Sequence, residues 1–405
     1  MTRGVGGSTA EAELAKLRSM RDVVPPITEV ERRGRIARLQ AIMRAQGVQA
    51  LYLDASTTTF YFTGLRLRGS ERLHGVIIPA EGELAYVTPA FEAAKLETMI
   101  SLPGRIYCWH EHESPTALVI DAVRGMGYAN GTLAIDPATP FFTFDGLRRA
   151  GNAFDFVNAT QVTAGCRMIK SAGEIALMQH AMRLTLEVHK AAARILRAGI
   201  TTTEVEAFIG RAHSALGFDV PASFCIVLFG EATAYPHGVP YPQTLMEGDT
   251  VLIDIGAPMH GYHSDVTRSY VFGEPSARQR EVWDVEKRAT EAVFAAAQIG
   301  TPCEALDRAA RDVIEAAGFA KEYGLPGLPH RTGHGIGLDV HEEPYIVQGD
   351  ATRLAPGMCF SNEPTICIYG EFGMRLEDHI HITEIGPAWF TTPALSIDDP
   401  FGEGG

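Results

Sequence analysis

One stretch of this chain, residues 250–273, restricts its possible folds more than any other: TVLIDIGAPMHGYHSDVTRSYVFG. Two apolar, β-prone runs flank the turn-forming residues PMHG, which predicts a β-hairpin. Each run carries one acidic residue, Asp254 within the first run and Asp265 at the start of the second. A turn centred between Met259 and His260 would place the two carboxylates directly opposite each other on one face of the hairpin.

A pair of facing carboxylates needs a physical explanation. Like charges that face each other across a strand pair are destabilising, and an isolated buried carboxylate costs several kcal/mol. A divalent cation between the two groups would offset that cost, so the hairpin predicts a metal site. The alternative is a hairpin whose two aspartates lie in solvent at its mouth.

A second hairpin of the same kind is predicted from residues 358–366 and 373–383. If its turn is centred on Gly370, Glu363 and Glu377 would face each other. As in the first hairpin, each acidic residue interrupts an apolar run. The second hairpin therefore offers a second pair of carboxylates.

The two hairpins belong to a longer repeat. Ser171 and Ser276, which lie 105 residues apart, each begin a helical stretch with a capping-box pattern, and each stretch is followed by another helix and then by a hairpin. Asp254 and Glu363 lie 109 residues apart. The similar offsets predict two related helix-helix-hairpin halves.

The first part of the chain has a different pattern. Strand-like runs alternate with helical stretches, which predicts an α/β domain. We expect this domain to be a scaffold or an oligomer surface, because it holds no cluster of potential ligands and no phosphate-binding loop.

Composition excludes several classes of protein. The chain has 49 acidic and 35 basic residues and a net charge of −14, which argues against a nucleic-acid partner. No apolar run is long enough to span a membrane, and the N-terminus has no secretory signal. Six cysteines are scattered without a CxxC pair, so free thiols in the cytoplasm are expected.

A third segment lies between the hairpins, PHRTGHGIGLDVHEEP at residues 329–344. Glycines on both sides of His334 allow a close approach of the backbone to a crowded centre. One imidazole and four carboxylates suit two divalent ions such as Mn²⁺, Co²⁺, Fe²⁺ or Zn²⁺, which can polarise a carbonyl and hold a bridging hydroxide. The predicted ligands are Asp254, Asp265, His334, Glu363 and Glu377.

These segments resemble the creatinase, prolidase and methionine aminopeptidase family. The resemblance covers most of the chain and includes residues 52–64, residues 166–181 and the PHGVP segment at 236–240. It implies a creatinase-like α/β domain at residues 1–165. It also implies a pita-bread α+β catalytic domain with an internal pseudo-twofold repeat at residues 166–405. The four acids and His334 would bind two metals, manganese first, with cobalt, zinc or iron as alternatives.

The resemblance also implies roles for individual residues. Glu363 would accept a proton from the water and pass it to the leaving nitrogen, while His341 and His237 would contact the scissile carbonyl or the oxyanion. Arg375 would hold Glu377 or a substrate carboxylate, and His330 would shape the pocket.

For three further residues the sequence does not decide the role. His379 and His381 share the face of Glu377 and could lie either at the site or on an exposed sheet face. Cys367 stands where many family members have tyrosine, which puts substrate range and rate in question.

The expected activity is a dimetal hydrolase that cleaves Xaa-Pro dipeptides, as a homodimer. The alternatives are an Xaa-Pro aminopeptidase, a hydrolase or lyase acting on a small zwitterionic metabolite, and a catalytically silent binding protein. Intact ligands argue against the last of these.

Overall fold

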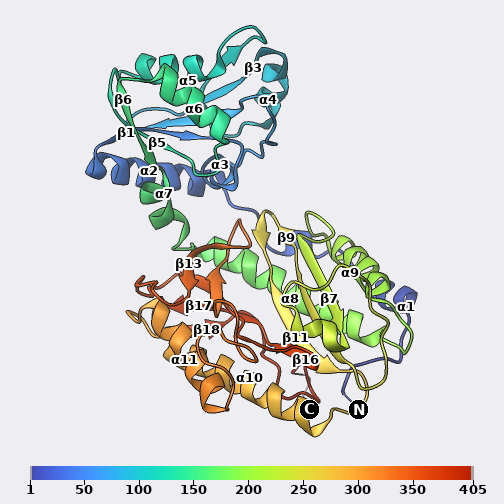
Figure 1. The fold of residues 1–405 in the computed structure, drawn as a ribbon. Coiled ribbons are helices and arrows are strands. Elements are labelled where there is room, and N and C mark those ends of the chain that lie inside the picture. The colour runs from blue at the N-terminus through green and yellow to red at the C-terminus, as the bar shows by residue number, and fades with distance from the viewer. Residues whose placement is uncertain (1, 403–405) are drawn as a thin grey trace. The chain divides into compact units, whose positions relative to one another are not determined.

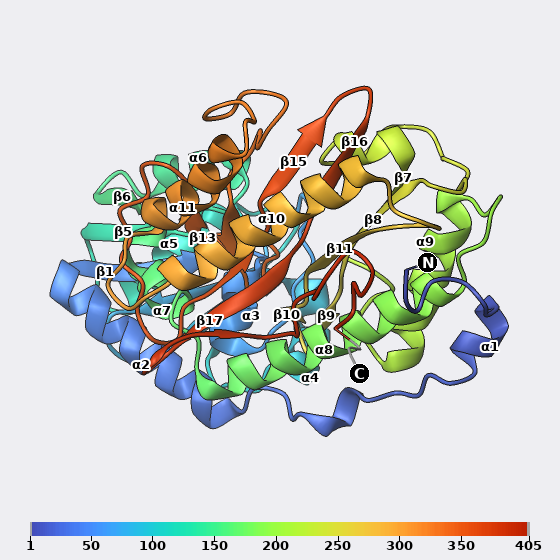
Figure 2. The ribbon, with the colours of Figure 1, turned by 90° about the horizontal axis from the view of Figure 1, so that it is seen from below.

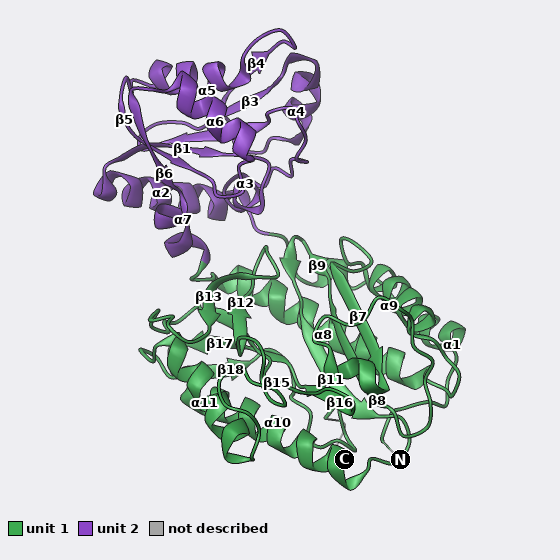
Figure 3. Cartoon of the chain, viewed as in Figure 1, with its two compact units in different colours: residues 1–26, 168–405 green, residues 27–167 purple. Residues whose placement is uncertain are grey.

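The computed structural model of the protein describes residues 2–402. Its contacts divide the chain into two compact units (Figure 3), unit 1 from residues 1–26 and 168–405 and unit 2 from residues 27–167. No helix within the described range is long and apolar enough to cross a membrane.

The N-terminal segment differs from the predicted domain division, which assigned residues 1–165 to one domain. Residues 1–26 belong to unit 1 instead. The backbone N–H of Gly6 donates to the Ala193 carbonyl at 2.9 Å, and the buried Glu13 carboxylate binds Arg194 at 2.8 Å. Leu14 and Leu17 pack against the main hydrophobic core of unit 1. Only a few side chains of the segment make these contacts, so its sequence does not indicate that it packs on unit 1.

Unit 2 confirms the predicted α/β architecture. Its six-stranded sheet has the order β4-β3-β2-β1-β5-β6, with β1–β2 and β2–β3 antiparallel and the other pairs parallel. The strands are β1 Val48–Leu53, β2 Gly75–Pro79, β3 Ala85–Pro89, β4 Arg105–Trp109, β5 Gly131–Ile135 and β6 Phe154–Asn158. The helices are α2 Glu29–Gln46, α3 Thr57–Thr63, α4 Ala93–Met99, α5 Pro115–Gly125, α6 Phe141–Ala150 and α7 Thr160–Arg167, with η2 Ala90–Glu92 as a 3₁₀ turn.

Unit 1 contains the predicted repeat (Figure 1). Each half has two helices and then a set of strands. The first half comprises α8 Ala172–Arg194, α9 Thr202–Leu216, β7 Phe224–Phe229, η3 Gly230–Ala234, β8 Thr250–Gly256, β9 Pro258–Met259, β10 Tyr262–His263 and β11 Val266–Val271. The second comprises α10 Ala277–Ala296, α11 Cys303–Ala316, β12 Gly333–Gly335, β13 Glu342–Ile346, β14 Cys359–Asn362, β15 Thr365–Ile368, β16 Phe372–Arg375, β17 Asp378–Thr383 and β18 Gly386–Trp389. The N-terminal segment adds α1 Ala10–Leu14 and η1 Arg21–Val23.

The two pairs of helices enclose the strands of unit 1. Strands β11 and β17 lie between α8 and α10 (Figure 2). Capping boxes begin three of the four helices, with the N-cap side chains of Ser171, Thr201 and Ser276 each accepting from the backbone three residues later. The predicted helix starts at Ser171 and Ser276 are therefore confirmed.

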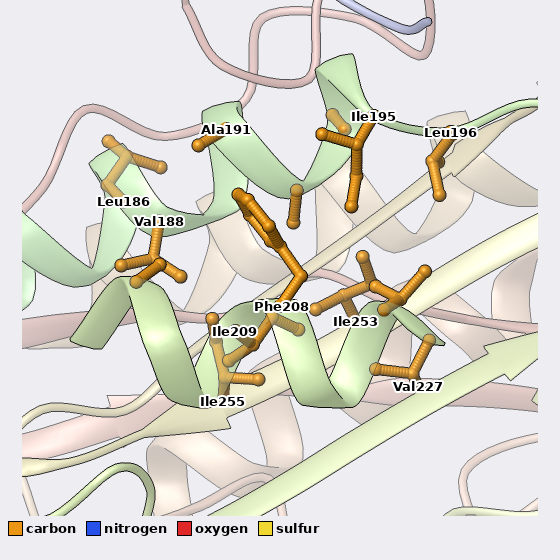
Figure 4. Packing of buried hydrophobic residues seen from close by; sticks show 14 of the residues in the cluster. Leu186, Val188, Ala191, Ile195, Leu196, Phe208, Ile209, Val227, Ile253 and Ile255 are labelled. Atoms are coloured by element: carbon orange, nitrogen blue, oxygen red, sulfur yellow. The ribbon is translucent and has the colours of Figure 1, made fainter. Parts of the chain in front are cut away.

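Strand periodicity decides which side chains of β8 face the helices. Ile253 and Ile255 point into the core with Phe208 and Ile209 of α9 (Figure 4). Because successive side chains of a strand point to opposite faces, Asp254 points away from this core. The packing of α8 and α9 against β8 therefore turns the carboxylate toward the other face of the sheet.

The first hairpin has a different register from the predicted one. Asp254 pairs with Thr267, and the turn lies between His260 and Gly261, one residue later than expected. His260 and Gly261 have φ angles of 51° and 92°, which is the backbone of a type I′ turn. Asp254 and Asp265 are therefore diagonal neighbours on one face and not direct partners.

The register of the second hairpin is the predicted one. Asn362 pairs with Asp378 on one side and Thr365 pairs with Arg375 on the other, so the strands are centred on Gly370. Glu363 lies opposite Glu377 in the gap between these two paired segments. The prediction for this carboxylate pair is confirmed.

One buried guanidinium joins the two hairpins. Arg268 of β11 is fully buried, pairs with Asp378 at 2.8 Å and donates to the carbonyl oxygen of Glu377 at 2.9 Å. The backbone N–H of Glu377 donates to the Thr267 carbonyl at 3.2 Å. These contacts fix the second carboxylate pair relative to the first.

We expect the Arg268→Met variant to lower the free energy of unfolding of the metal-free protein by about 3–5 kcal/mol, because it leaves Asp378 buried without its partner. Urea unfolding followed by circular dichroism measures this loss. Arg278→Met is the matched control, since Arg278 and Glu281 form an exposed pair, and it should cost less than about 1 kcal/mol. Equal losses in both variants would contradict the role given to Arg268.

Candidate metal centre

The five predicted ligands meet in one region of unit 1. Nε2 of His334 lies 3.0 Å from Oε1 of Glu363 and 3.6 Å from Oδ2 of Asp265. Asp265, His334 and Glu377 each place one potential ligand atom within 4.8 Å of the other two. All but Glu363 are buried, and the cavity beside them has a volume of ≈ 600 Å³.

Five separate segments position these side chains. Asp254 lies on β8, Asp265 immediately before β11, His334 on β12, Glu363 immediately after β14, and Glu377 between β16 and β17. Gly333 precedes His334 where an added Cβ would lie 2.1 Å from the Ser361 carbonyl oxygen. Glycine is therefore required for β12 to pass this close to β14.

The electrostatics of the cluster require a positive charge. Burial and neighbouring carboxylates raise the pKa of Asp265 and the pKa of Glu377 well above the usual range. Burial also raises the pKa of Asp254, against the opposing effect of Arg375. Burial would raise the pKa of Glu363 as well, but the neighbouring His334 holds the pKa of Glu363 well below its usual range. Ionising all four acids together therefore needs cations.

The donor set fits divalent metal ions. Oδ1 of Asp254 and Oε1 of Glu377 are buried and have no hydrogen-bond donor within residues 2–402. Nδ1 of His334 donates to the Gly335 carbonyl at 3.0 Å, which leaves Nε2 as the unprotonated nitrogen facing the carboxylates. Free carboxylate oxygens and one oriented imidazole are suitable ligands for Mn²⁺, Co²⁺, Fe²⁺ or Zn²⁺.

Arg375 has a different partner from the one predicted. Its Nη2 binds Oδ2 of Asp254 at 2.6 Å, its Nε donates to Thr267 Oγ1 at 3.3 Å and its Nη1 donates to the Pro236 carbonyl at 3.2 Å. Thr267 in turn donates to Oε2 of Glu377 at 2.6 Å. Arg375 reaches both Asp254 and Thr267 because the register of β8 and β11 places these two residues opposite each other. The role of Arg375 at a substrate carboxylate stays a prediction.

The predicted histidines surround the cavity. His237, His330 and His341 all line it. His341 reaches solvent and its ring packs edge-on against His334 with centroids 4.2 Å apart. Nδ1 of His330 donates to the Arg331 carbonyl at 2.6 Å, and its Nε2 lies 3.0 Å from the hydroxyl of Thr365. Both nitrogens of His330 are thus engaged by the protein, in keeping with a pocket-shaping role.

The structure also places the residues left open by the sequence. His379 is fully buried, with its ring centroid 6.1 Å from that of His334, so it does not lie on an exposed sheet face. His381 is half-buried and packs against Phe390 at 4.8 Å. Cys367 is buried on β15 and does not line the cavity, and burial raises the pKa of its thiol to about 12.

Several cavity residues were missed by the sequence analysis. Ser223, Phe224, Ile226 and Val340 supply one hydroxyl and an apolar wall. No local pattern distinguishes these side chains from ordinary strand and loop residues. Arg331 also lines the cavity, and its place beside His330 in the glycine-rich segment was an available signal.

Comparisons with known proteins agree with this geometry. The family model described as metallopeptidase family M24 matches residues 176–384, and that of the creatinase/prolidase N-terminal domain matches residues 35–169. The chain is 37% identical to the "Probable dipeptidase PepE" of Mycobacterium tuberculosis, over 87% of this chain and 92% of that protein.

Solved structures show the same fold. The crystal structure of dipeptidase PepE from Mycobacterium ulcerans is similar with a TM-score of 0.84 and 34% identity, over 91% of this chain and 97% of that one. A recombinant prolidase from Thermococcus sibiricus is similar with a TM-score of 0.81 and 31% identity, over 89% of this chain and 96% of that one. Both the two-domain architecture and the pita-bread fold predicted from the sequence are thereby confirmed.

We expect alanine substitution of any one predicted ligand to reduce the bound metal by at least one ion per chain and to abolish hydrolysis, because the remaining carboxylates cannot hold both ions. Elemental analysis of purified Asp254→Ala protein measures the metal directly. Glu384→Ala, which changes an exposed acid, is the control and should keep full metal content. Two ions and full activity in Asp254→Ala protein would show that the ligand assignment is wrong.

Proposed function

Because the chain belongs to metallopeptidase family M24, we propose that it is a metal-dependent dipeptidase that cleaves the peptide bond preceding proline. The observation that carries the proposal is the cluster of four acids and His334, three of whose acids line the cavity together with His334, with buried carboxylate oxygens left free to bind cations. The names of the similar proteins, dipeptidase and prolidase, support the substrate class.

The metal ions would be held by Asp254, Asp265, His334, Glu363 and Glu377. When bound, two divalent ions lower the pKa of water and polarise a carbonyl, which is the chemistry that amide hydrolysis needs. Manganese is the ion we propose first, with cobalt, zinc and iron as alternatives.

The protein residues supply proton transfer and orientation. Glu363 is the general base and acid, because it is the one acidic ligand whose pKa is held low and whose carboxylate is less buried than the others. His341 and His237 lie on the cavity wall and reach solvent, so they can orient the scissile carbonyl as substrate enters. Burial and the neighbouring His334 lower the pKa of His341 to about 4, which makes it a neutral donor at neutral pH.

The size and lining of the cavity favour a small substrate with an apolar ring. A volume of ≈ 600 Å³ is within the range of sites for small molecules. The side chains of Phe224, Ile226 and Val340 offer an apolar wall to a proline ring. Since a bond to proline has no N–H to donate, ring shape is what remains for the enzyme to recognise at that position.

We expect the Mn²⁺-loaded enzyme to hydrolyse Leu-Pro with a kcat/KM at least about tenfold higher than that for Leu-Pro-amide, because a site that pairs a charged group rejects substrates lacking it. The control substrates are a Leu-Pro tripeptide and cyclic amino-acid derivatives. Equal values for Leu-Pro, its amide and the tripeptide would indicate an aminopeptidase. Activity confined to the cyclic derivatives would indicate a hydrolase of small zwitterions.

We propose that the protein is a homodimer in the cytoplasm. Unit 2 exposes Phe141 and Phe142 at the start of α6, with 78% and 57% of their surface accessible, and a self-association surface would cover them. All six cysteines are free, which suits a reducing compartment.

We expect light scattering at micromolar concentration to give twice the 43.9 kDa mass of one chain. The double variant Phe141→Ser/Phe142→Ser should shift the mass toward that of one chain if this surface is the interface. A monomer in the unmodified protein would contradict the dimer.

A further inference from the structure

The guanidinium of Arg331 is a cation in the cavity that no acid within residues 2–402 neutralises. Arg331 lines the cavity together with Glu363 and His341. Its Cζ lies 4.7 Å from the centroid of the Tyr345 ring, a cation–π contact that orients the planar group. Within residues 2–402, no carboxylate lies within ion-pair distance of it and its guanidinium makes no hydrogen bond.

Arg375, the other arginine that lines the cavity, is not available to bind a substrate carboxylate. Arg375 is only 3% exposed, and all three of its nitrogens bind protein acceptors, including Asp254. Turning Arg375 toward a ligand would leave Asp254 buried without its partner, which is strongly destabilising. A negatively charged group that enters the cavity therefore finds its free partner in Arg331.

The backbone that carries Arg331 is held on both sides. The preceding carbonyl, that of His330, accepts from Arg311 at 2.6 Å, and the following residue, Thr332, donates its hydroxyl to Asp307 at 2.7 Å. Tyr345 pairs with His334 in the β12–β13 ladder. The ring that supports the guanidinium is thus directly opposite a predicted metal ligand.

The acid cluster determines where in the cavity a substrate carboxylate can bind. Three carboxylates of the cluster line the cavity and the fourth, that of Glu377, lies beside Asp265 and His334. A substrate carboxylate is therefore repelled from that side wherever bound cations do not compensate. A planar guanidinium can bind a carboxylate through two parallel hydrogen bonds. Arg331 places such a group in the same cavity as the metal ligands.

We propose that Arg331 binds the C-terminal carboxylate of the dipeptide and thereby limits the substrate to two residues. This inference rests on the proposed dipeptidase function. It replaces Arg375, the candidate from the sequence, with a residue whose guanidinium is free.

Equilibrium binding tests the inference separately from catalysis. The probes are two analogues of Leu-Pro in which a methylene replaces the scissile carbonyl, one with a free C-terminal carboxylate and one with an amide. Titration calorimetry with the Mn²⁺-loaded enzyme compares the unmodified protein, Arg331→Gln and Arg331→Lys. Arg105→Gln is the matched control, because Arg105 also stacks on a tyrosine, Tyr107 at 4.6 Å, but does not line the cavity.

We expect Arg331→Gln to weaken binding of the free acid about 10- to 100-fold, the range for a lost hydrogen bond to a charged group, and to leave binding of the amide unchanged. Arg331→Lys should bind the free acid with intermediate affinity, because it keeps the charge without the planar fork. The control should bind as the unmodified protein does. In hydrolysis of Leu-Pro, the loss in Arg331→Gln should lie mainly in KM.

Three outcomes would overturn the inference. Equal weakening of acid and amide would make Arg331 a structural residue, and so would loss of bound Mn²⁺ in both Arg331 variants. A loss confined to Asp-Pro and Glu-Pro, with Leu-Pro unaffected, would assign Arg331 to the side chain before proline. Failure of the unmodified protein to bind either analogue would instead reject the dipeptidase function on which the inference rests.

Discussion

The mutual repulsion of four acidic side chains in one buried region is the constraint on which the rest of unit 1 depends. Acids in this environment resist ionisation, and the raised pKa values of Asp265 and Glu377 express that resistance. Fixed guanidinium groups compensate part of the charge: Arg375 pairs with Asp254, and Arg268 pairs with Asp378 behind the cluster. Neither contacts the free oxygens of Asp254 and Glu377, which are left for cations.

The repeated architecture explains how so many acids are brought together. Strand alternation sends the apolar residues of each hairpin toward its own pair of helices and the acids toward the other face. The Thr267–Glu377 bridge then joins the two hairpins at the level of the ligands. Each half supplies one carboxylate pair, and neither half alone has enough ligands for two ions.

The sequence was a reliable guide where a single dominant pattern controlled the structure. The second hairpin has the predicted register because its apolar runs and Gly370 agree on one turn. The first hairpin does not, because its type I′ turn requires His260 to adopt a positive φ, which residue type alone does not predict. The five predicted ligands still converge, because the partner of Asp254 changes from Asp265 to Thr267, two residues away, and both aspartates therefore stay on one face.

Long-range partners could not be predicted in the same way. Arg375 and Asp254 are 121 residues apart, and their pairing depends on how two hairpins cross. The contacts of the N-terminal segment with α8 involve residues of ordinary composition. The apolar wall of the cavity also comes from residues without any local signature. Information of this kind exists only in the folded chain.

The charge distribution of unit 1 favours one orientation of a dipeptide in the cavity. Unit 2 contains fourteen acidic and fourteen basic residues, so the net charge of −14 belongs entirely to unit 1. The field of such a unit attracts the ammonium end of a zwitterionic dipeptide and repels its carboxylate. The carboxylate end is then accepted only where a local cation reverses the field. Arg331 is placed to do so, because no acid in the described part of the chain neutralises its guanidinium. Attraction of one end by the whole unit and of the other by one side chain would orient the dipeptide before the scissile bond reaches the metal ligands.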